Sequence, residues 1–302
     1  MEKLISSTSN FVTRDPHMTK HNGLYYHCFT EDAKSVSISC ADTIENLSNA
    51  QSKKVYIPEE HQEYSHELWA PELHIIDHKC YIYVACDDGD NRNHRMYVLE
   101  NGSSDPLNPY IMHGKITDKT DKWAIDGTVM EYDGERYFIW SGWEGDINVC
   151  QNLYIAKMKN PYEIHSERVM ISTPEYDWEK LGSDFKTGYP YVNEGAYVFT
   201  VDNQLYMTYS AAGSWCQDYC IAVLKLVGTD PLNPSAWKKM SVPVFSGNEK
   251  VKGAGHCSVV CGDNILHVFF HAWDREEKDI KWNKVSVWHA EMKITDDKIS
   301  II

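Results

Sequence analysis

The stretch Tyr132-Asp133-Gly134-Glu135-Arg136-Tyr137-Phe138 contains the pattern that decides the fold, a short polar turn followed by an aromatic strand. Asp and Gly tolerate the positive φ that a tight two-residue hairpin turn requires. The same form recurs about every sixty residues, in His21–Tyr26, Asp77–Tyr83, Val201–Met207 and Cys261–His267. The repetition predicts five antiparallel hairpins placed regularly along the chain.

A second apolar, alternating run follows each of these hairpins, so each repeat has room for three or four antiparallel strands. The pentapeptide Asp-Pro-Leu-Asn-Pro occurs at Asp105–Pro109 and again at Asp230–Pro234, where it indicates a surface turn between repeats. Helical periodicity is missing, and a β-sandwich would not explain the regular recurrence. We therefore expect an all-β, five-bladed β-propeller that forms a single domain over residues 1–302.

The composition excludes several classes of function and binding partner. A net charge of −15 argues against nucleic acid or an anionic membrane as a partner, because both require Lys and Arg to meet phosphate. No apolar run reaches the length of a signal peptide or a membrane span. The 10 Trp and 19 Tyr suit a groove for flat sugar faces, although tyrosine is also common in strands.

The nine cysteines include no Cys-x-x-Cys pair. Those at Cys28, Cys80, Cys86, Cys150 and Cys261 lie in or beside apolar strand-like runs. We interpret them as reduced, buried side chains, and this favours a cytoplasmic protein. An extracellular protein whose signal peptide has been removed is the alternative.

An ionisable residue stands about ten positions before the aromatic strand of each repeat. These residues are Asp15, Glu72, Asp126, Glu194 and His256. In a propeller the innermost strand of each blade lines the central channel, so we expect the five side chains to converge on one axis. A single Asp or Glu at such a place is usually a turn or cap residue. Five at matching places favour a functional ring, since buried like charges are costly.

Three of these residues occur in motifs that resemble glycoside hydrolase family 43, the five-bladed arabinofuranosidases, xylosidases and arabinanases. The motifs are Arg14-Asp15-Pro16, Ile125-Asp126-Gly127 and Asn193-Glu194-Gly195, in this order, and the resemblance extends to about His271. The stretch Trp69-Ala70-Pro71-Glu72-Leu73-His74 is similar to the arabinofuranosidase branch.

The resemblance implies that Asp15 is the general base, that Glu194 is the general acid, and that Asp126 raises the pKa of Glu194 and orients it. Hydrolysis through an oxocarbenium-like transition state requires one carboxyl group ionised and one protonated at the same pH. The family inverts the anomeric carbon, so we expect the carboxyl groups of Asp15 and Glu194 to lie roughly 6.5–9.5 Å apart.

The resemblance also makes His256 the axial histidine beneath the pocket, which in many members faces a calcium ion through water. Calcium prefers oxygen ligands, so a neutral, hydrogen-bonded histidine is the alternative. No cofactor is expected to be required for the chemistry itself.

Four further residues are candidates for sugar binding. Trp69 and Trp143 either stack on sugar rings or belong to the core. Glu72 is expected to bind sugar hydroxyls. Arg14 either holds the neighbouring base ionised or is simply solvated.

The last repeat departs from the family pattern. Members often have an arginine there that reaches the axis, whereas this chain has a charged stretch at 274–284. Arg275 and Lys281 are the possible substitutes.

These observations favour an inverting exo-α-L-arabinofuranosidase that releases terminal arabinose from arabinan or arabinoxylan oligosaccharides. A β-xylosidase and an endo-arabinanase are alternatives with the same machinery and an arabinose- or xylose-containing substrate. A non-catalytic sugar-binding propeller is a third possibility, but it would have no need of an acid–base pair.

Overall fold

The computed structural model describes residues 1–7, 12–262, 264–295 and 298–302, and within them the regular structure consists of β-strands with a few short 3-10 helices. The all-β prediction is therefore confirmed. Asp263, which belongs to the fifth predicted hairpin turn, lies outside the described residues. Across the described residues, no helix has the length and apolar character needed to cross a membrane.

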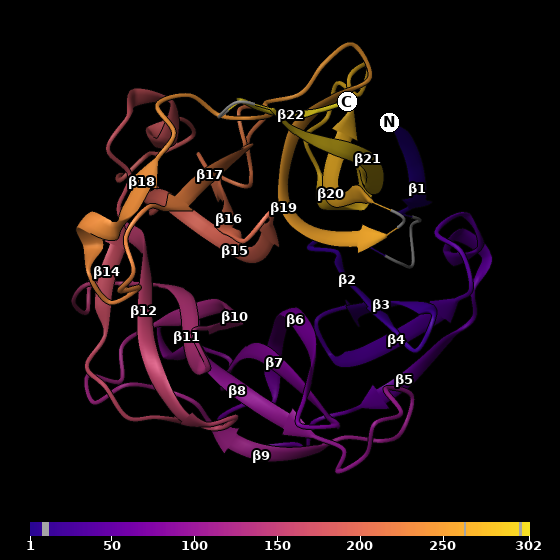
Figure 1. Cartoon of the computed structure of the whole chain (residues 1–302), viewed down its shortest axis with the longest axis vertical. Helices are drawn as coiled ribbons and strands as arrows, with labels where there is room; N and C mark the ends of the chain where they lie inside the picture. Colours follow the sequence, from indigo (N-terminus) through magenta and orange to yellow (C-terminus); the bar gives the residue numbers. More distant parts are fainter. Residues whose placement is uncertain (8–11, 263, 296–297) are drawn as a thin grey trace.

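The strands form four hydrogen-bonded sheets within the described chain (Figure 1). The first sheet contains β2 (His17–His21), β3 (Leu24–Glu31), β4 (Ser35–Ala41) and β5 (Ser52–Tyr56). The second contains β6 (His66–Ile76), β7 (Lys79–Asp87), β8 (Arg95–Glu100) and β9 (Ile111–Lys115).

The third sheet is the largest. It contains β10 (Ala124–Tyr132), β11 (Glu135–Gly142), β12 (Cys150–Asn160), β13 (Glu163–Ile164), β14 (Val169–Ser172), β15 (Tyr191–Val201), β16 (Gln204–Ala211), β17 (Cys220–Leu226) and β18 (Trp237–Lys239). The fourth contains β1 (Glu2–Ser6), β19 (Val251–Gly262), β20 (Ile265–Asp274), β21 (Val285–Thr295) and β22 (Lys298–Ile301). Short 3-10 helices connect the strands: η1 (Glu45–Asn49), η2 (Asn91–Asn93), η3 (Asp177–Lys180), η4 (Pro234–Ala236) and η5 (Trp282–Lys284).

The third sheet consists of two antiparallel parts joined by a short parallel pairing. Cys150 pairs with Tyr191 and Gln151 with Val192, which links β12 to β15. On either side of this link, β10–β11–β12 and β15–β16–β17–β18 are antiparallel runs like those of the other sheets. In Figure 1 the first strand of each run, namely β2, β6, β10, β15 and β19, lies toward the middle of the molecule.

The fourth sheet unites the two ends of the chain. Strand β1 pairs with β21, so that Glu2 lies opposite His289 and Ser6 opposite Ser286. Leu4 packs in the same apolar cluster as Met18, which follows in the first sheet. The N-terminal strand therefore belongs to the same sheet as the C-terminal strands (Figure 1).

The predicted hairpin turns are confirmed where the structure describes them. Asn22-Gly23, Asp77-His78, Asp133-Gly134 and Asp202-Asn203 each have positive φ at both residues. Two successive left-handed residues between paired strands define the type I′ turn, whose twist matches that of the strands. Asn and Asp supply most of these positions because they tolerate the left-handed region better than other side chains.

Many aromatic side chains belong to the core rather than to a groove. The fully buried residues include Tyr83, Tyr97, Tyr209 and Trp273. Among the cysteines, Cys28, Cys80 and Cys86 are buried as expected, and all nine thiols are free. The expectation of burial was wrong for Cys261, which is exposed, and Cys150 is only partly buried. Cys261 stands near the end of β19 and is the exposed residue of that strand, whose other residues are buried or partly buried.

The turn at Gly134 predicts a measurable backbone effect. Its φ is +75° and nothing lies within 4 Å of a Cβ added there, so Gly134→Ala introduces backbone strain without a clash. We expect the free energy of unfolding to fall by about 1–2 kcal/mol, measured by urea denaturation. Gly145→Ala is the matched control, since its surroundings are equally open and its φ is not in the left-handed region. Equal stability of both variants would contradict the assignment of this turn.

Candidate active site

Strands β6 and β19 each contain an early left-handed residue, Glu67 and Gly253. A further left-handed residue stands at a matching place near the start of all five inner strands. These residues are Asp15 (φ +50°), Ala70 (+42°), Asp126 (+54°), Gly195 (+59°) and His256 (+47°). In β6, β10, β15 and β19 the strand register shifts at this residue, which marks a β-bulge. Such a bulge redirects a side chain from the face of the sheet toward the end of the strand.

The bulge changes the predicted ring of five ionisable residues. Asp15, Asp126 and His256 occupy the left-handed position itself, whereas Glu194 precedes it by one residue and Glu72 follows it by two. Glu72 stands two residues after the left-handed residue of its strand, and His17 and Thr128 do the same in theirs. Two residues along a strand correspond to one step deeper on the same face, so Glu72 belongs with His17 and Thr128. The structure therefore brings four of the five residues to one cavity, and Glu72 is not among the residues that line it.

Asp15 is surrounded by cationic and polar groups. Nε of Arg14 lies 3.3 Å from its Oδ2, and Nδ1 of His256 lies 3.3 Å from its Oδ1. Its backbone N–H donates to Nδ1 of His271 at 3.1 Å. Burial alone would raise the pKa of Asp15, but the neighbouring His256 and Arg14 outweigh it and hold this pKa below its usual range. Asp15 is therefore ionised at neutral pH.

Glu194 has the opposite state. The Tyr219 hydroxyl donates to its Oε1 at 2.9 Å. Burial, followed by the charge of Asp126, raises the pKa of Glu194 to about 8. Burial and the charge of Asp15 also raise the pKa of Asp126, whose Oδ2 accepts a hydrogen bond from the Gly195 N–H at 3.1 Å. The pair of Asp126 and Glu194 therefore retains a proton at neutral pH, while Asp15 does not.

The cavity that contains these groups has a volume of about 360 Å³. Of the residues predicted for the site, those lining it are Arg14, Asp15, Trp69, Asp126, Glu194 and His256. The sequence analysis missed much of its wall, namely Asn91, Trp123, Asn148, Gln151, Tyr189, Trp215 and Trp282. Most of these residues lie outside the inner strands, so a search keyed to the strand starts could not find them.

Arg14 lies between two aromatic rings of the wall. Its guanidinium is 4.6 Å from the centroid of Trp282 and 6.0 Å from that of Trp69, within the range of cation–π contacts. Neither suggested last-repeat cation lines this cavity. Arg275 borders a different surface hollow, and Lys281 pairs with Asp279 on the surface.

Trp143 supports the wall instead of forming its surface. It is buried and stacks on Trp123, with ring centroids 4.9 Å apart and planes inclined by 11°. Trp123 lines the cavity and Trp143 does not. The core interpretation of Trp143 therefore fits the structure better than direct stacking on a sugar.

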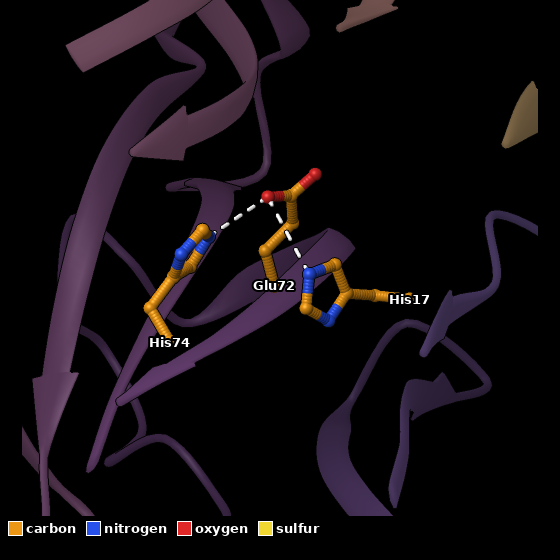
Figure 2. A group of neighbouring side chains, drawn as sticks. All are labelled: His17, Glu72 and His74. Atoms are coloured by element: carbon orange, nitrogen blue, oxygen red, sulfur yellow. Dashed lines mark hydrogen bonds and ion pairs between the residues drawn. The ribbon is translucent and has the colours of Figure 1, made fainter. Parts of the chain in front are cut away.

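Glu72 lies in a buried group with His17 and His74 (Figure 2). Nε2 of His74 is 2.9 Å from Oε2 of Glu72, and Nε2 of His17 is 3.7 Å from the same oxygen. The three ligand-type atoms are close enough together to hold a metal ion. However, the Leu73 N–H donates to Nδ1 of His17, and burial lowers the pKa of His17 to about 4. Neutral His17 therefore has its proton on Nε2, the atom that faces Glu72, and a protonated nitrogen is not a metal ligand. The hydrogen bond between His74 and Glu72 fits this metal-free arrangement.

A calcium ion near His256 remains a prediction of the family resemblance. Nδ1 of His256 faces carboxylates, at 3.3 Å from Asp15 and 3.8 Å from Asp126, and its backbone N–H donates to the Ser210 hydroxyl. Because calcium prefers oxygen ligands, the imidazole would meet such an ion only through water.

Comparison with known proteins identifies relatives along most of the chain. The model of glycosyl hydrolases family 43 matches residues 7–298. An extracellular exo-α-(1→5)-L-arabinofuranosidase of Streptomyces chartreusis is 31% identical over 275 residues, which cover 88% of this chain and 81% of that protein. The α-L-arabinofuranosidase B of Pyricularia oryzae is 34% identical over 278 residues, and the match spans 88% of this chain but only 55% of that longer protein.

Solved structures agree with these relatives. The α-L-arabinofuranosidase from Lactobacillus brevis superposes with a TM-score of 0.86 at 29% identity, covering 98% of this chain and 95% of the other. An endo-arabinase from Bacteroides thetaiotaomicron has a TM-score of 0.75 at 17% identity, covering 98% of this chain and 100% of the other, and shows a shared fold. Taken with the family match, these similarities show that the chain belongs to glycosyl hydrolase family 43.

Proposed function

We propose that this chain is an inverting exo-α-L-arabinofuranosidase that releases terminal arabinose from arabinan or arabinoxylan oligosaccharides. The observation that carries the proposal is one cavity holding an ionised Asp15 and a protonated Glu194. Glycoside hydrolysis requires this pair of opposite protonation states. The bacterial and fungal relatives are named as arabinofuranosidases, which supports arabinose as the sugar released.

In the proposed mechanism Asp15 accepts a proton from a water molecule as its oxygen attacks the anomeric carbon. Glu194 donates its proton to the departing glycosidic oxygen, and the bond between that oxygen and the anomeric carbon breaks. Attack and departure on opposite faces of the sugar invert the anomeric carbon. After the reaction Asp15 carries the proton taken from water and Glu194 is ionised. Loss of a proton from Asp15 to solvent and uptake of one by Glu194 restore both groups.

The neighbouring residues assist each step without exchanging protons with the substrate. Arg14 and His256 keep Asp15 ionised, and the Tyr219 hydroxyl fixes one oxygen of Glu194. Asp126 raises the pKa of Glu194 by its nearby charge. The indole rings of Trp69 and Trp282 offer apolar faces to the sugar, with the Arg14 guanidinium between them.

The proposal includes the architecture. We infer that residues 1–302 form one domain of five blades, in which the nine-stranded sheet contains two blades joined by the parallel link of β12 and β15. The support is the left-handed residue that recurs near the start of β2, β6, β10, β15 and β19. The solved relatives of this family share the propeller fold.

The relatives also bear on location. The Streptomyces chartreusis enzyme is named as extracellular, and this favours a secreted protein over the cytoplasmic one that the cysteines suggested. The buried free thiols fit either location, because a buried thiol is shielded from reaction.

Replacing the two reacting carboxyl groups tests the mechanism. We expect Asp15→Ala and Glu194→Ala each to lower kcat/KM about 10²–10⁴-fold, because each removes one proton transfer. Release of p-nitrophenol from the α-L-arabinofuranoside and of arabinose from an arabino-oligosaccharide measures the loss, with the p-nitrophenyl β-D-xyloside as the comparison sugar. Wild-type protein inactive on both glycosides, or activity that survives both substitutions, would defeat the mechanism.

The pH profile tests the assignment of the acid. Glu194 must be protonated to act, so kcat/KM is expected to fall as the pH rises through about 8. Asp126→Asn removes a charge that raises the pKa of Glu194, so this alkaline limb should move to lower pH. Kinetics between pH 4 and 10 give the profile. A limb that does not move would show that Asp126 has no such role.

The stereochemistry tests the inverting geometry. The first arabinofuranose released from an α-linked substrate should be the β-anomer, seen by proton NMR before mutarotation. Initial appearance of the α-anomer would instead require a covalent intermediate, for which two carboxyl groups about 5 Å apart are typical.

A further inference from the structure

A buried carboxylate outside the cavity, that of Glu179, connects to the strand of the general acid. Glu179 belongs to η3 and is 0% exposed. Its Oε1 accepts hydrogen bonds from Asn193 Nδ2 (3.0 Å), the Tyr209 hydroxyl (3.0 Å) and Lys239 Nζ (2.9 Å). Its Oε2 accepts from the backbone N–H groups of Glu175 (2.7 Å) and Tyr176 (2.9 Å). The pKa of Glu179 is lowered because these donors, above all Lys239, outweigh the effect of burial.

Asn193 is the residue through which this carboxylate reaches the active site. It immediately precedes Glu194 in β15 and is 0% exposed. Its side-chain oxygen accepts from the Ser172 hydroxyl at 2.7 Å and from Lys239 Nζ at 3.3 Å. Its carbonyl accepts from the Ser141 hydroxyl at 2.9 Å. The backbone from which Glu194 projects is therefore held from behind by a set of buried hydrogen bonds.

The chain segment from Glu179 to Gly182 also holds one wall of the cavity in place. The backbone carbonyl of Glu179 accepts from the Ala212 N–H at 3.1 Å, and the Gly182 carbonyl accepts from the Trp215 indole at 2.7 Å. Trp215 lines the cavity, and its ring lies 4.5 Å from that of Tyr189, which lines it too. An anchor at Glu179 therefore serves both the acid and the wall beside it.

The partner of Glu179 comes from a distant part of the sequence. Lys239 lies in β18, and its ammonium group also donates to the Thr173 carbonyl at 2.6 Å. Buried ion pairs contribute little net stability compared with apolar residues of the same size, yet breaking one leaves an uncompensated charge. A pair in this position is therefore better explained by what it orients than by the stability that it adds.

We propose that the buried pair of Glu179 and Lys239 positions the general acid Glu194, acting through Asn193. This inference rests on the proposed function and assigns it two positioning residues outside the cavity. Neither Glu179 nor Lys239 lines the cavity.

The test uses two substrates that differ in leaving group. The departing alkoxide of an arabino-oligosaccharide needs a proton from Glu194, whereas p-nitrophenolate leaves almost unaided. Lys239→Met keeps the length of the side chain and removes its charge. We expect it to lower kcat on arabinobiose about 10–100-fold, with a much smaller loss on p-nitrophenyl α-L-arabinofuranoside, because a small displacement of a proton donor costs this much. A purely structural role would lower both rates equally.

Two further variants keep the test decisive. In the double variant Glu179→Gln with Lys239→Met, no unpaired charge remains and the amide oxygen can still accept from Asn193, so arabinobiose activity should partly return. Leu224→Ala is the matched control. It removes a buried side chain from β17 of the same sheet that takes no part in these hydrogen bonds, so it should lower the melting temperature without separating the two substrates.

A measurement without turnover separates this inference from the proposed function. NMR of ¹³C-labelled glutamate, with the Glu194 signal assigned through Glu194→Gln, reports the titration of that carboxyl group in the wild type and in Lys239→Met. A shifted titration supports positioning even if arabinosides prove not to be substrates. An unchanged titration, or equal losses on both substrates, would overturn the proposal.

Discussion

The candidate active site depends on a left-handed residue at a matching place in, or just before, each inner strand. A β-strand directs successive side chains to opposite faces, which by itself would send Asp126 and its neighbours into the interfaces between sheets. The left-handed residue in each strand interrupts this order and turns one side chain toward the shared cavity. Asp15, Asp126 and His256 occupy that position, and Glu194 stands beside it. The close approach of carboxyl groups from different strands follows from this local backbone feature.

The close approach of these carboxyl groups makes their negative charges repel one another, and this repulsion sets their protonation states. Three carboxyl groups within one buried site cannot all be ionised, because like charges repel strongly where water is excluded. Arg14 pairs with Asp15, and Nδ1 of His256 lies closer to Asp15 (3.3 Å) than to Asp126 (3.8 Å). The negative charge therefore stays on Asp15, and a proton stays on the pair of Asp126 and Glu194. The difference in pKa between Asp15 and Glu194 comes from the placement of Arg14 and His256 as much as from the carboxyl groups themselves.

Sequence reasoning could predict what is local or repeated. The type I′ turns at Asn22-Gly23 and Asp133-Gly134 follow from residues that tolerate positive φ, and the repeated turn led to the inner strands and their carboxylates. Sequence reasoning placed Glu72 in the same ring because residue counting along the chain cannot reveal a bulge. The bulge changes which side chain of the strand turns toward the cavity. The same reasoning missed Trp215 and Trp282 because their place beside the site depends on loop paths and contacts between distant segments.

Holding this site has a cost that the surrounding sheets must offset. A left-handed residue with a Cβ costs roughly 1–2 kcal/mol, and the net stability of a domain is only about 5–15 kcal/mol. Four of the five left-handed residues at matching places have a Cβ, with Gly195 the exception. Glycine at that place meets a second requirement, since an added Cβ would lie 3.1 Å from the His256 ring. The strain is concentrated where the inner strands meet, and the apolar clusters between the sheets lie farther out. The pairing of β1 with β21 joins the first residues of the chain to the last sheet, so these residues help to hold a site in which they take no direct part.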